Sequence, residues 1–274
     1  MTNLGNLPPA QSRGFVRLDA GAATPGTAQV AEEVPVAFVY GGKPHVVMMC
    51  TPADIEDLAV GFTLSEEIAA GLSEIIRYDV VRHARGIEVQ IELHPDAQAR
   101  VADRTRALAG RTGCGLCGID AIDNAIREPR VVRARAQFSA ASVARAGESL
   151  AANQPLNAET RAVHAAAWAN DAGELMVVRE DVGRHNALDK VIGALARAGR
   201  DPSTGFFVVT SRASYELVQK VAVAGSPLLA AVSRPTGLAI DFAERAGLTL
   251  VGVVRGANAN VYSHAARVTE VTQR

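Results

Sequence analysis

The strongest constraint on the fold is a regular alternation of apolar runs and helical patterns after Glu174. The runs L-M-V-V-R, F-F-V-V-T-S-R, L-L-A-A-V-S-R and L-T-L-V-G-V-V-R each have the length and composition of a buried strand. Helical patterns separate them over about residues 186–198, 215–224 and 237–246. Strands that alternate with helices in this way are typical of an α/β domain with a mostly parallel sheet.

The chain before Glu174 predicts a smaller α+β subdomain. The runs V-P-V-A-F-V-Y and K-P-H-V-V-M-M-C flank Gly41-Gly42 and predict a hairpin, and two further strands are expected over residues 78–83 and 87–93. A helix should begin at Thr51-Pro52 with the threonine as its cap, and another should cover residues 97–109. Residues 140–170 predict two alanine-rich helices that are interrupted at Pro155.

These patterns predict three parts. Residues 1–28 are rich in Ala, Gly, Thr and Pro and predict a loose tail. Residues 29–135 form the N-terminal α+β subdomain, which ends in a cysteine loop and its helix, and residues 136–274 form an α/β domain that binds a cofactor.

The composition excludes several classes of protein. A formal net charge of −1 argues against a protein that binds nucleic acid through bulk charge. Three cysteines in 274 residues indicate a reducing compartment. The chain has neither an apolar run long enough to span a membrane nor a secretory signal at its start, so we expect a cytoplasmic protein.

A C-x-x-C motif lies in the glycine-rich stretch T-G-C-G-L-C-G and contains Cys114 and Cys117. Such a motif can be half of a metal site, a dithiol–disulfide pair or a sulfur carrier. Only Cys50 remains as a further cysteine, so a four-ligand zinc site is disfavoured, and a disulfide would close too small a loop to stabilise the fold. Two interpretations of the C-x-x-C motif remain: its thiols are reactive, or the motif is incidental.

The residues after Cys117 favour reactive thiols. Apolar residues at positions 119, 122 and 126 predict a helix that begins just past the cysteines. Its N-terminal dipole would stabilise a thiolate. Arg111 would add to this effect, whereas Asp120 and Asp123 would oppose it.

All four predicted strands of the α/β domain end in arginine, at Arg179, Arg212, Arg234 and Arg255. In an open α/β sheet, ligands bind beyond the carboxyl ends of the strands. Ser211 and Ser233 precede two of these arginines, and helices follow, so N–H groups are also available for phosphate. The pattern indicates a polyanionic ligand with a pyrophosphate; arginines that merely cap strand ends in solvent are the alternative.

The segment R-E-D-V-G-R-H-N-A-L-D-K, residues 179–190, occupies the first of these strand-to-helix junctions. His185 is four residues from both Asp181 and Asp189 and could share a helix face with either. This arrangement would suit a proton relay or a phosphate clamp. In the alternative, Asp181 caps the helix and His185 is half-exposed.

Together with E-V-P-V-A-F-V-Y and S-R-A-S-Y-E-L-V-Q-K, these motifs resemble the FdhD family of formate dehydrogenase accessory sulfurtransferases. The resemblance implies a carrier that takes persulfide sulfur from a cysteine desulfurase and passes it to the bis-molybdopterin guanine dinucleotide cofactor of formate dehydrogenase. It implies that Cys114 carries the persulfide and that Cys117 assists. It also places cofactor contacts in the segment Val253, Val254, Arg255, Gly256, Ala257 and Asn258.

The resemblance further implies a three-layer αβα domain similar to the cytidine deaminase fold. The zinc-binding H-x-E of those enzymes is absent here, and Gly113 replaces the proline of their P-C-x-x-C, so no structural metal and no deamination are expected. A guanine nucleotide could mimic part of the cofactor. Because the cofactor is large, its groove should be shared by two subunits, which predicts a homodimer.

Two other functions are compatible with the sequence. In the first, the protein is a chaperone that holds the cofactor or the dehydrogenase, and its cysteines are incidental. In the second, it is a thioredoxin-like redox protein, although the motif lacks an aromatic residue before Cys114 and does not follow a strand in a βαβ unit.

Overall fold

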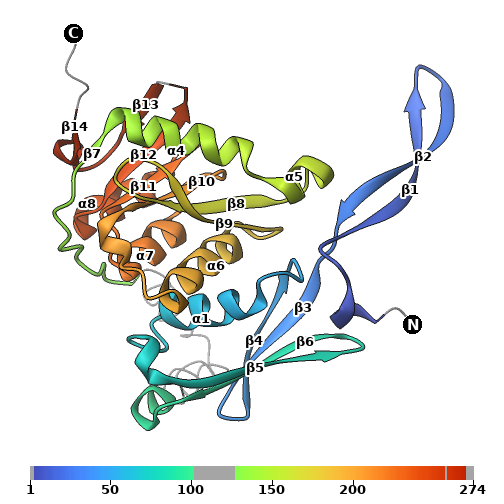
Figure 1. Ribbon diagram of the computed structural model, residues 1–274, viewed down its shortest axis with the longest axis horizontal. Helices are drawn as coiled ribbons and strands as arrows, with labels where there is room; N and C mark the ends of the chain where they lie inside the picture. The colour runs from blue at the N-terminus through green and yellow to red at the C-terminus, as the bar shows by residue number, and fades with distance from the viewer. Residues whose placement is uncertain (1–2, 102–126, 257, 270–274) are drawn as a thin grey trace, which may run out of the picture.

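The computed structural model describes residues 3–101, 127–256 and 258–269. Figure 1 shows a larger α/β domain, a smaller sheet with one helix beside it, and a hairpin that extends away from both. No helix of this described part combines the length and the apolar character that crossing a bilayer requires.

The larger domain is built on a six-stranded sheet of order β13-β12-β11-β10-β8-β9. Strands β10, β11 and β12 are parallel, whereas β8 is antiparallel to both β10 and β9. The carboxyl ends of β9, β10, β11 and β12 therefore lie at one edge, as the sequence predicts. The strand bounds are β8 His164–Ala169, β9 Leu175–Asp181, β10 Phe206–Val209, β11 Leu228–Ala231, β12 Thr249–Arg255 and β13 Asn258–Val261.

Helices cover both faces of this sheet and form the expected three layers. Phe207 and Val209 of β10 belong to the core beneath α6, α7 and α8, whereas Phe206 and Val208 face the core beneath α4. This division follows from the alternation of side chains along a strand. The bounds are α4 Ala140–Ala152, α6 Arg184–Arg197, α7 Tyr215–Ala224 and α8 Gly237–Ala246. The short strands β7 (Phe138–Ser139) and β14 (Val268–Thr269) pair beside α4.

The prediction of two helices over residues 140–170 is only partly correct. Helix α4 and the short α5 (Pro155–Thr160) are present, and they are interrupted at Pro155. Residues 164–169 form β8, whose alanines are buried between β9 and β10. Alanine favours helices in isolation, but here its small side chain fits between the helical layers, so the tertiary position overrides the propensity.

The N-terminal subdomain holds a four-stranded sheet of order β4-β3-β6-β5 and helix α1 (Ile55–Ser65). The predicted hairpin on Gly41-Gly42 and the later strand pair are confirmed. Phe38 of β3 and Val89 of β6 face the core, where they pack with Leu58 of α1. The strand bounds are β3 Val34–Tyr40, β4 Lys43–Cys50, β5 Ile75–His83 and β6 Gly86–Leu93.

The predicted cap of α1 is wrong. The helix begins at Ile55, and Asp54 precedes it in a left-handed conformation without a side-chain cap. The Thr51 hydroxyl instead accepts a hydrogen bond of 3.1 Å from the backbone N–H of Val182, far along the chain. The Thr51 hydroxyl, which the local sequence predicts as a helix cap, therefore makes a tertiary hydrogen bond instead.

Two glycines bring α1 and α6 into backbone contact. A Cβ atom at Gly61 of α1 would lie 1.7 Å from the Asp189 carbonyl oxygen, and one at Gly193 of α6 would lie 1.9 Å from that of Asp57. Both distances are far below van der Waals contact, so only glycine fits at the crossing. This close approach joins the N-terminal subdomain to the α/β domain.

The first residues are more ordered than the loose tail expected over residues 1–28. Strands β1 (Ala10–Asp19) and β2 (Ala22–Ala31) pair in an antiparallel hairpin that we call the arm. The turn lies at Ala20-Gly21, both at positive φ. Nearly every residue of the arm is solvent-exposed. Its strands therefore lack the alternation of apolar and polar residues by which a half-buried strand is predicted from sequence.

Candidate functional site

The carboxyl edge of the six-stranded sheet carries three of the four predicted arginines. Arg212, Arg234 and Arg255 lie at the carboxyl ends of the neighbouring parallel strands β10, β11 and β12. Val209 of β10 pairs with Ala231 of β11, and Ala230 of β11 pairs with Val251 of β12, so the three arginines have equivalent positions. Their side chains are exposed, and none forms an ion pair with another residue that the structure describes. We call this set the arginine rim: Arg212, Arg234 and Arg255.

Hydrogen bonds hold the loops of the rim together. The Thr236 N–H donates to the Ala213 carbonyl at 3.0 Å, and the Val253 N–H donates to the Ser233 carbonyl at 3.2 Å. The buried Ser211 hydroxyl donates to the carbonyl of Arg212, so this serine orders the loop. Helices α7 and α8 begin directly after these loops, and the positive ends of their dipoles favour an anion there.

The segment predicted to contact the cofactor has a strained backbone. Val253 adopts φ +57°, a left-handed conformation that a β-branched residue rarely takes, beside a register shift in the β12–β13 pairing. Val254 is buried, whereas Arg255, Gly256 and Asn258 are exposed. Strain of this kind is common where a site imposes the backbone path.

Arg179 does not join the rim, contrary to the prediction. Its Nε donates to Asp57 Oδ2 at 2.8 Å, and Asp54 lies 3.5 Å away. The unpredicted strand β8 lies between β9 and β10, so it separates Arg179 from the other three. Arg179 therefore links β9 to α1. Its guanidinium is paired with Asp57, unlike the exposed guanidinium groups of the rim.

His185 lies at the start of α6 and faces α7. Its Nε2 atom lies 2.6 Å from Oε2 of Glu216, and burial lowers the pKa of this histidine although Glu216 opposes the shift. Neither aspartate proposed as its relay partner contacts it. Asp181 pairs with Lys190, and Asp189 pairs with Lys220.

His185 and Glu216 line a cavity of about 360 Å³ where α1, α6 and α7 meet. Met48 and Phe62 supply its apolar wall. The N–H of Arg127, the first described residue after the cysteine segment, donates to the Tyr215 hydroxyl at 2.7 Å. The chain thus returns from the cysteine segment beside this cavity.

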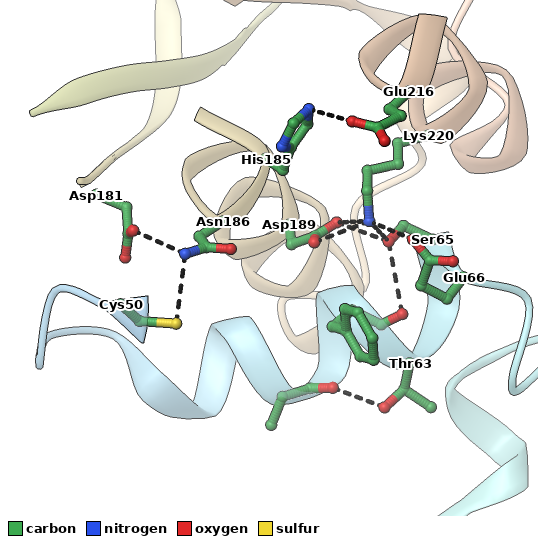
Figure 2. A network of polar contacts seen from close by, with 12 residues as sticks. Cys50, Thr63, Ser65, Glu66, Asp181, His185, Asn186, Asp189, Glu216 and Lys220 are labelled. Carbon is green, nitrogen blue, oxygen red and sulfur yellow. Dashed lines mark hydrogen bonds and ion pairs between the residues drawn. The ribbon is translucent and has the colours of Figure 1, made fainter. Parts of the chain in front are cut away.

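Glu66, Asp189 and Lys220, which also line this cavity, form a polar network that Figure 2 shows. Lys220 of α7 donates to both oxygens of Asp189 at 3.0 and 2.9 Å, to Ser65 at 2.9 Å and to Glu66 at 2.9 Å. Burial would lower the pKa of Lys220, but Asp189 and Glu66 raise it. Burial would raise the pKa of Glu66, but Lys220 and Arg127 lower it to about 2. The network therefore holds a cation among carboxylates.

A second buried ion pair joins α6 to β9 beside the end of β4, and Figure 2 shows its aspartate, Asp181, with Asn186 and Cys50. Lys190 Nζ lies 2.6 Å from Asp181 Oδ2, and both side chains are fully buried. Asn186 donates to Asp181 at 2.9 Å and to the Cys50 sulfur at 3.3 Å. Burial raises the pKa of the Cys50 thiol, with Asp181 adding to the shift. Cys50 is thus a packed thiol at the end of β4, although this strand is not buried as a whole, because Val47 and Met49 are exposed.

Residues 31–269 match the model of the FdhD/NarQ family. The chain belongs to this family. It is 52% identical over 239 residues to the sulfur carrier protein FdhD of Xanthomonas euvesicatoria pv. vesicatoria (strain 85-10), covering 87% of this chain and 85% of that protein. It is 50% identical over 240 residues to the sulfur carrier protein FdhD of Cupriavidus necator (strain ATCC 17699 / DSM 428 / KCTC 22496 / NCIMB 10442 / H16 / Stanier 337), covering 88% and 83%.

A solved structure has the same fold. It is described as that of a candidate formate dehydrogenase accessory protein from Desulfotalea psychrophila, with a TM-score of 0.77 and 24% identity. The match covers 96% of this chain and all of the other. This likeness confirms the mixed α/β fold, whereas the expected similarity to cytidine deaminases stays a prediction.

The central predicted residues of this FdhD/NarQ protein, Cys114 and Cys117, lie outside the described residues, as does Ala257. The family match spans all three positions. Within the described ranges, no cluster of three or more His, Cys, Asp or Glu side chains could hold a metal ion.

The sequence patterns did not predict the ion pairs of the buried network. Asp189 and Lys190 lie in the buried half of α6, and Lys220 lies in that of α7. The helical pattern already places these charged residues on buried faces, and a charged residue is rarely buried without a partner. Lys190 pairs with Asp181 of the same segment, whereas Asp189 and Lys220 are 31 residues apart, so no local pattern predicts that second pair.

Proposed function

We propose that this FdhD/NarQ protein is a sulfur carrier. It would accept persulfide sulfur from a cysteine desulfurase on Cys114, with Cys117 assisting, and pass it to the bis-molybdopterin guanine dinucleotide of formate dehydrogenase. The observation that carries the proposal is the 52% identity, over 87% of the chain, to a protein named sulfur carrier protein FdhD. The family match includes both cysteines of the C-x-x-C motif.

The first step is an exchange between two sulfur atoms. The Cys114 thiolate attacks the terminal sulfur of the donor persulfide, a new S–S bond forms on Cys114, and the S–S bond of the donor breaks. The donor leaves as a thiolate and takes up the proton that Cys114 released. This exchange conserves electrons and needs no further oxidant or reductant.

The arginine rim suits the cargo of this reaction. The proposed cofactor has two nucleotide tails, and each tail carries a pyrophosphate. Arg212, Arg234 and Arg255 lie near the N-termini of α7 and α8, and none of them has an ion-pair partner among the described residues. Each charge-assisted contact to phosphate contributes about 1.5–3 kcal/mol. A cofactor of this size favours a homodimer, in which two subunits share the groove.

Intact-mass measurement after incubation with an active desulfurase and cysteine tests the proposal. The wild type should gain one sulfur, Cys114→Ala should gain none, and Cys50→Ala should behave like the wild type because Cys50 is buried. A wild type that stays unmodified beside an active, cognate desulfurase would rule out the carrier role.

The second candidate is a chaperone that binds the cofactor without carrying sulfur, and the exposed arginine rim also favours it. Cys114→Ala separates the two functions. A chaperone with this substitution would still support formate dehydrogenase activity in a strain that lacks the native protein, whereas a sulfur carrier would not.

A further inference from the structure

A cavity of about 290 Å³ lies where α1, α6 and α7 meet, near the carboxyl ends of the three helices. Figure 1 shows these helices at the junction between the α/β domain and the N-terminal sheet. The chain leaves α6 and α7 at this end to enter β10 and β11, and the arginine rim stands at the other end of those strands. The cavity therefore lies at the opposite edge of the sheet from the proposed cofactor site.

The lining of this cavity is mostly apolar. Small residues such as Ala70, Ala196 and Ala224 leave the space between the helices open. Ser65 also lines it, but its hydroxyl already donates to Asp189 at 2.6 Å. Ligand pockets are typically clefts of about 300–1,000 Å³ with a mostly apolar lining, so the interior suits the apolar body of a small molecule. The larger apolar residues of the lining are Leu64, Leu72, Ile192, Pro202 and Val223.

Two arginines line the cavity together with these apolar residues. Arg130 precedes α4 and Arg200 follows α6, and both are exposed. Glu67 lies 3.9 Å from Arg130, beyond hydrogen-bond distance, and their side chains are 37% and 54% exposed, so this pair is weak. Arg200 has no ion-pair partner in the part of the chain that the structure describes. The donors of both guanidinium groups are therefore available to a ligand.

The helix ends determine which anion these arginines would bind. The carboxyl-terminal carbonyls of α6 and α7 carry partial negative charge, which stabilises nearby cations and disfavours a strongly charged anion. A phosphate fits better at the arginine rim, where helix N-termini are present. A carboxylate has a single negative charge and can accept two parallel hydrogen bonds from one guanidinium. The charges around the cavity therefore favour a monocarboxylate.

We propose that this cavity binds a small monocarboxylic acid with an aromatic or branched aliphatic body. The body fills the apolar space between α6 and α7, and the carboxylate accepts hydrogen bonds from Arg130 and Arg200. The residues that line this cavity differ from those of the rim and from those of the cavity beside His185. The inference is therefore independent of sulfur transfer.

Calorimetric titration of the full chain with phenylbutyrate tests the proposal. We expect one saturable site per chain, and we expect phenylbutanol, which has the same apolar body without the charge, to bind about tenfold more weakly or worse. Arg130→Gln/Arg200→Gln should lower the affinity for phenylbutyrate by about tenfold or more. Arg133→Gln/Arg161→Gln is the matched control, because it removes the same charge from two exposed arginines outside the cavity. It should bind phenylbutyrate like the wild type.

Methyl NMR locates the bound acid, because the signals of Ile192 and Val223 should shift on binding. A wild type that binds no phenylbutyrate at millimolar concentrations would overturn the proposal, and so would binding that Arg130→Gln/Arg200→Gln leaves unchanged. Tighter binding of the peptide acetyl-Gly-Gly-Phe than of phenylbutyrate would also overturn it. The cavity would then be a docking site for the carboxyl terminus of a protein.

Discussion

The ammonium nitrogen of Lys220 on α7 lies 2.9 Å from Oδ2 of Asp189 on α6, and both side chains are buried. Ser65 and Glu66, at the end of α1, complete the shell around this pair. One cation thereby connects three helices from both parts of the molecule. The stability of the junction should depend on it.

Lys220→Met should destabilise the fold strongly, because it leaves the Asp189 carboxylate buried without a cation. Removing one partner of a buried ion pair costs about 3–5 kcal/mol. The double variant Lys220→Met/Asp189→Leu should recover much of this loss. Urea unfolding of the three proteins measures the difference, and equal stability of the single and double variants would contradict the assignment.

The same cation makes stability depend on pH through Glu66. The pKa of Glu66 is about 2 in the folded protein, against 4.5 ordinarily. Its carboxylate therefore stabilises the fold fully above the ordinary value, and this contribution is lost as the pH falls towards 2. The difference in melting temperature between wild type and Glu66→Gln should shrink between pH 5 and pH 3. A constant difference would contradict the depressed pKa.

The arginine rim should dominate the binding of phosphate ligands. Replacing Arg212, Arg234 or Arg255 by glutamine should weaken the binding of guanosine diphosphate by about tenfold or more, as the loss of one charge-assisted contact predicts. Arg179→Gln is the contrast, because Arg179 pairs with Asp57 and should affect stability more than affinity. Calorimetric titration of the four variants measures this, and equal losses of affinity in all four would refute the distinction.

Two neighbouring positions should respond oppositely to substitution. Val253 and Gly256 both have positive φ, +57° and +54°. Val253→Gly relieves a strained conformation and should raise stability by about 1 kcal/mol, whereas Gly256→Ala introduces strain and should lower it by a similar amount. Thermal unfolding distinguishes the two signs. A loss in both variants would show that side-chain contacts of Val253 outweigh the strain.

Cys50 should be inert in the folded protein. It is fully buried, and burial raises the pKa of its thiol. In a Cys114→Ala/Cys117→Ala background, a maleimide should label no site in the native protein and one site in urea. Rapid labelling without denaturant would show that β4 opens.

Local sequence patterns were sufficient where the local signal and the tertiary position agree. Helices α7 and α8 have the predicted bounds, Tyr215–Ala224 and Gly237–Ala246, because apolar periodicity and a terminal glycine both mark them. The arginine rim was predicted in part, because parallel strands place their carboxyl ends at one edge of the sheet. Residues 164–169 show the limit, because burial made a strand of an alanine-rich run.

The sequence by itself determined the family, the three-layer α/β domain and the three arginines of the rim, because motifs and periodicity are properties of neighbouring residues. Only the tertiary structure decided the partners of the charges. Asp57 binds Arg179, and Asp189 binds Lys220, across sequence separations that no local pattern encodes. These pairs form because packing α1 against α6 at Gly61 and Gly193 removes the charges from water, where a cation without a carboxylate would be unstable.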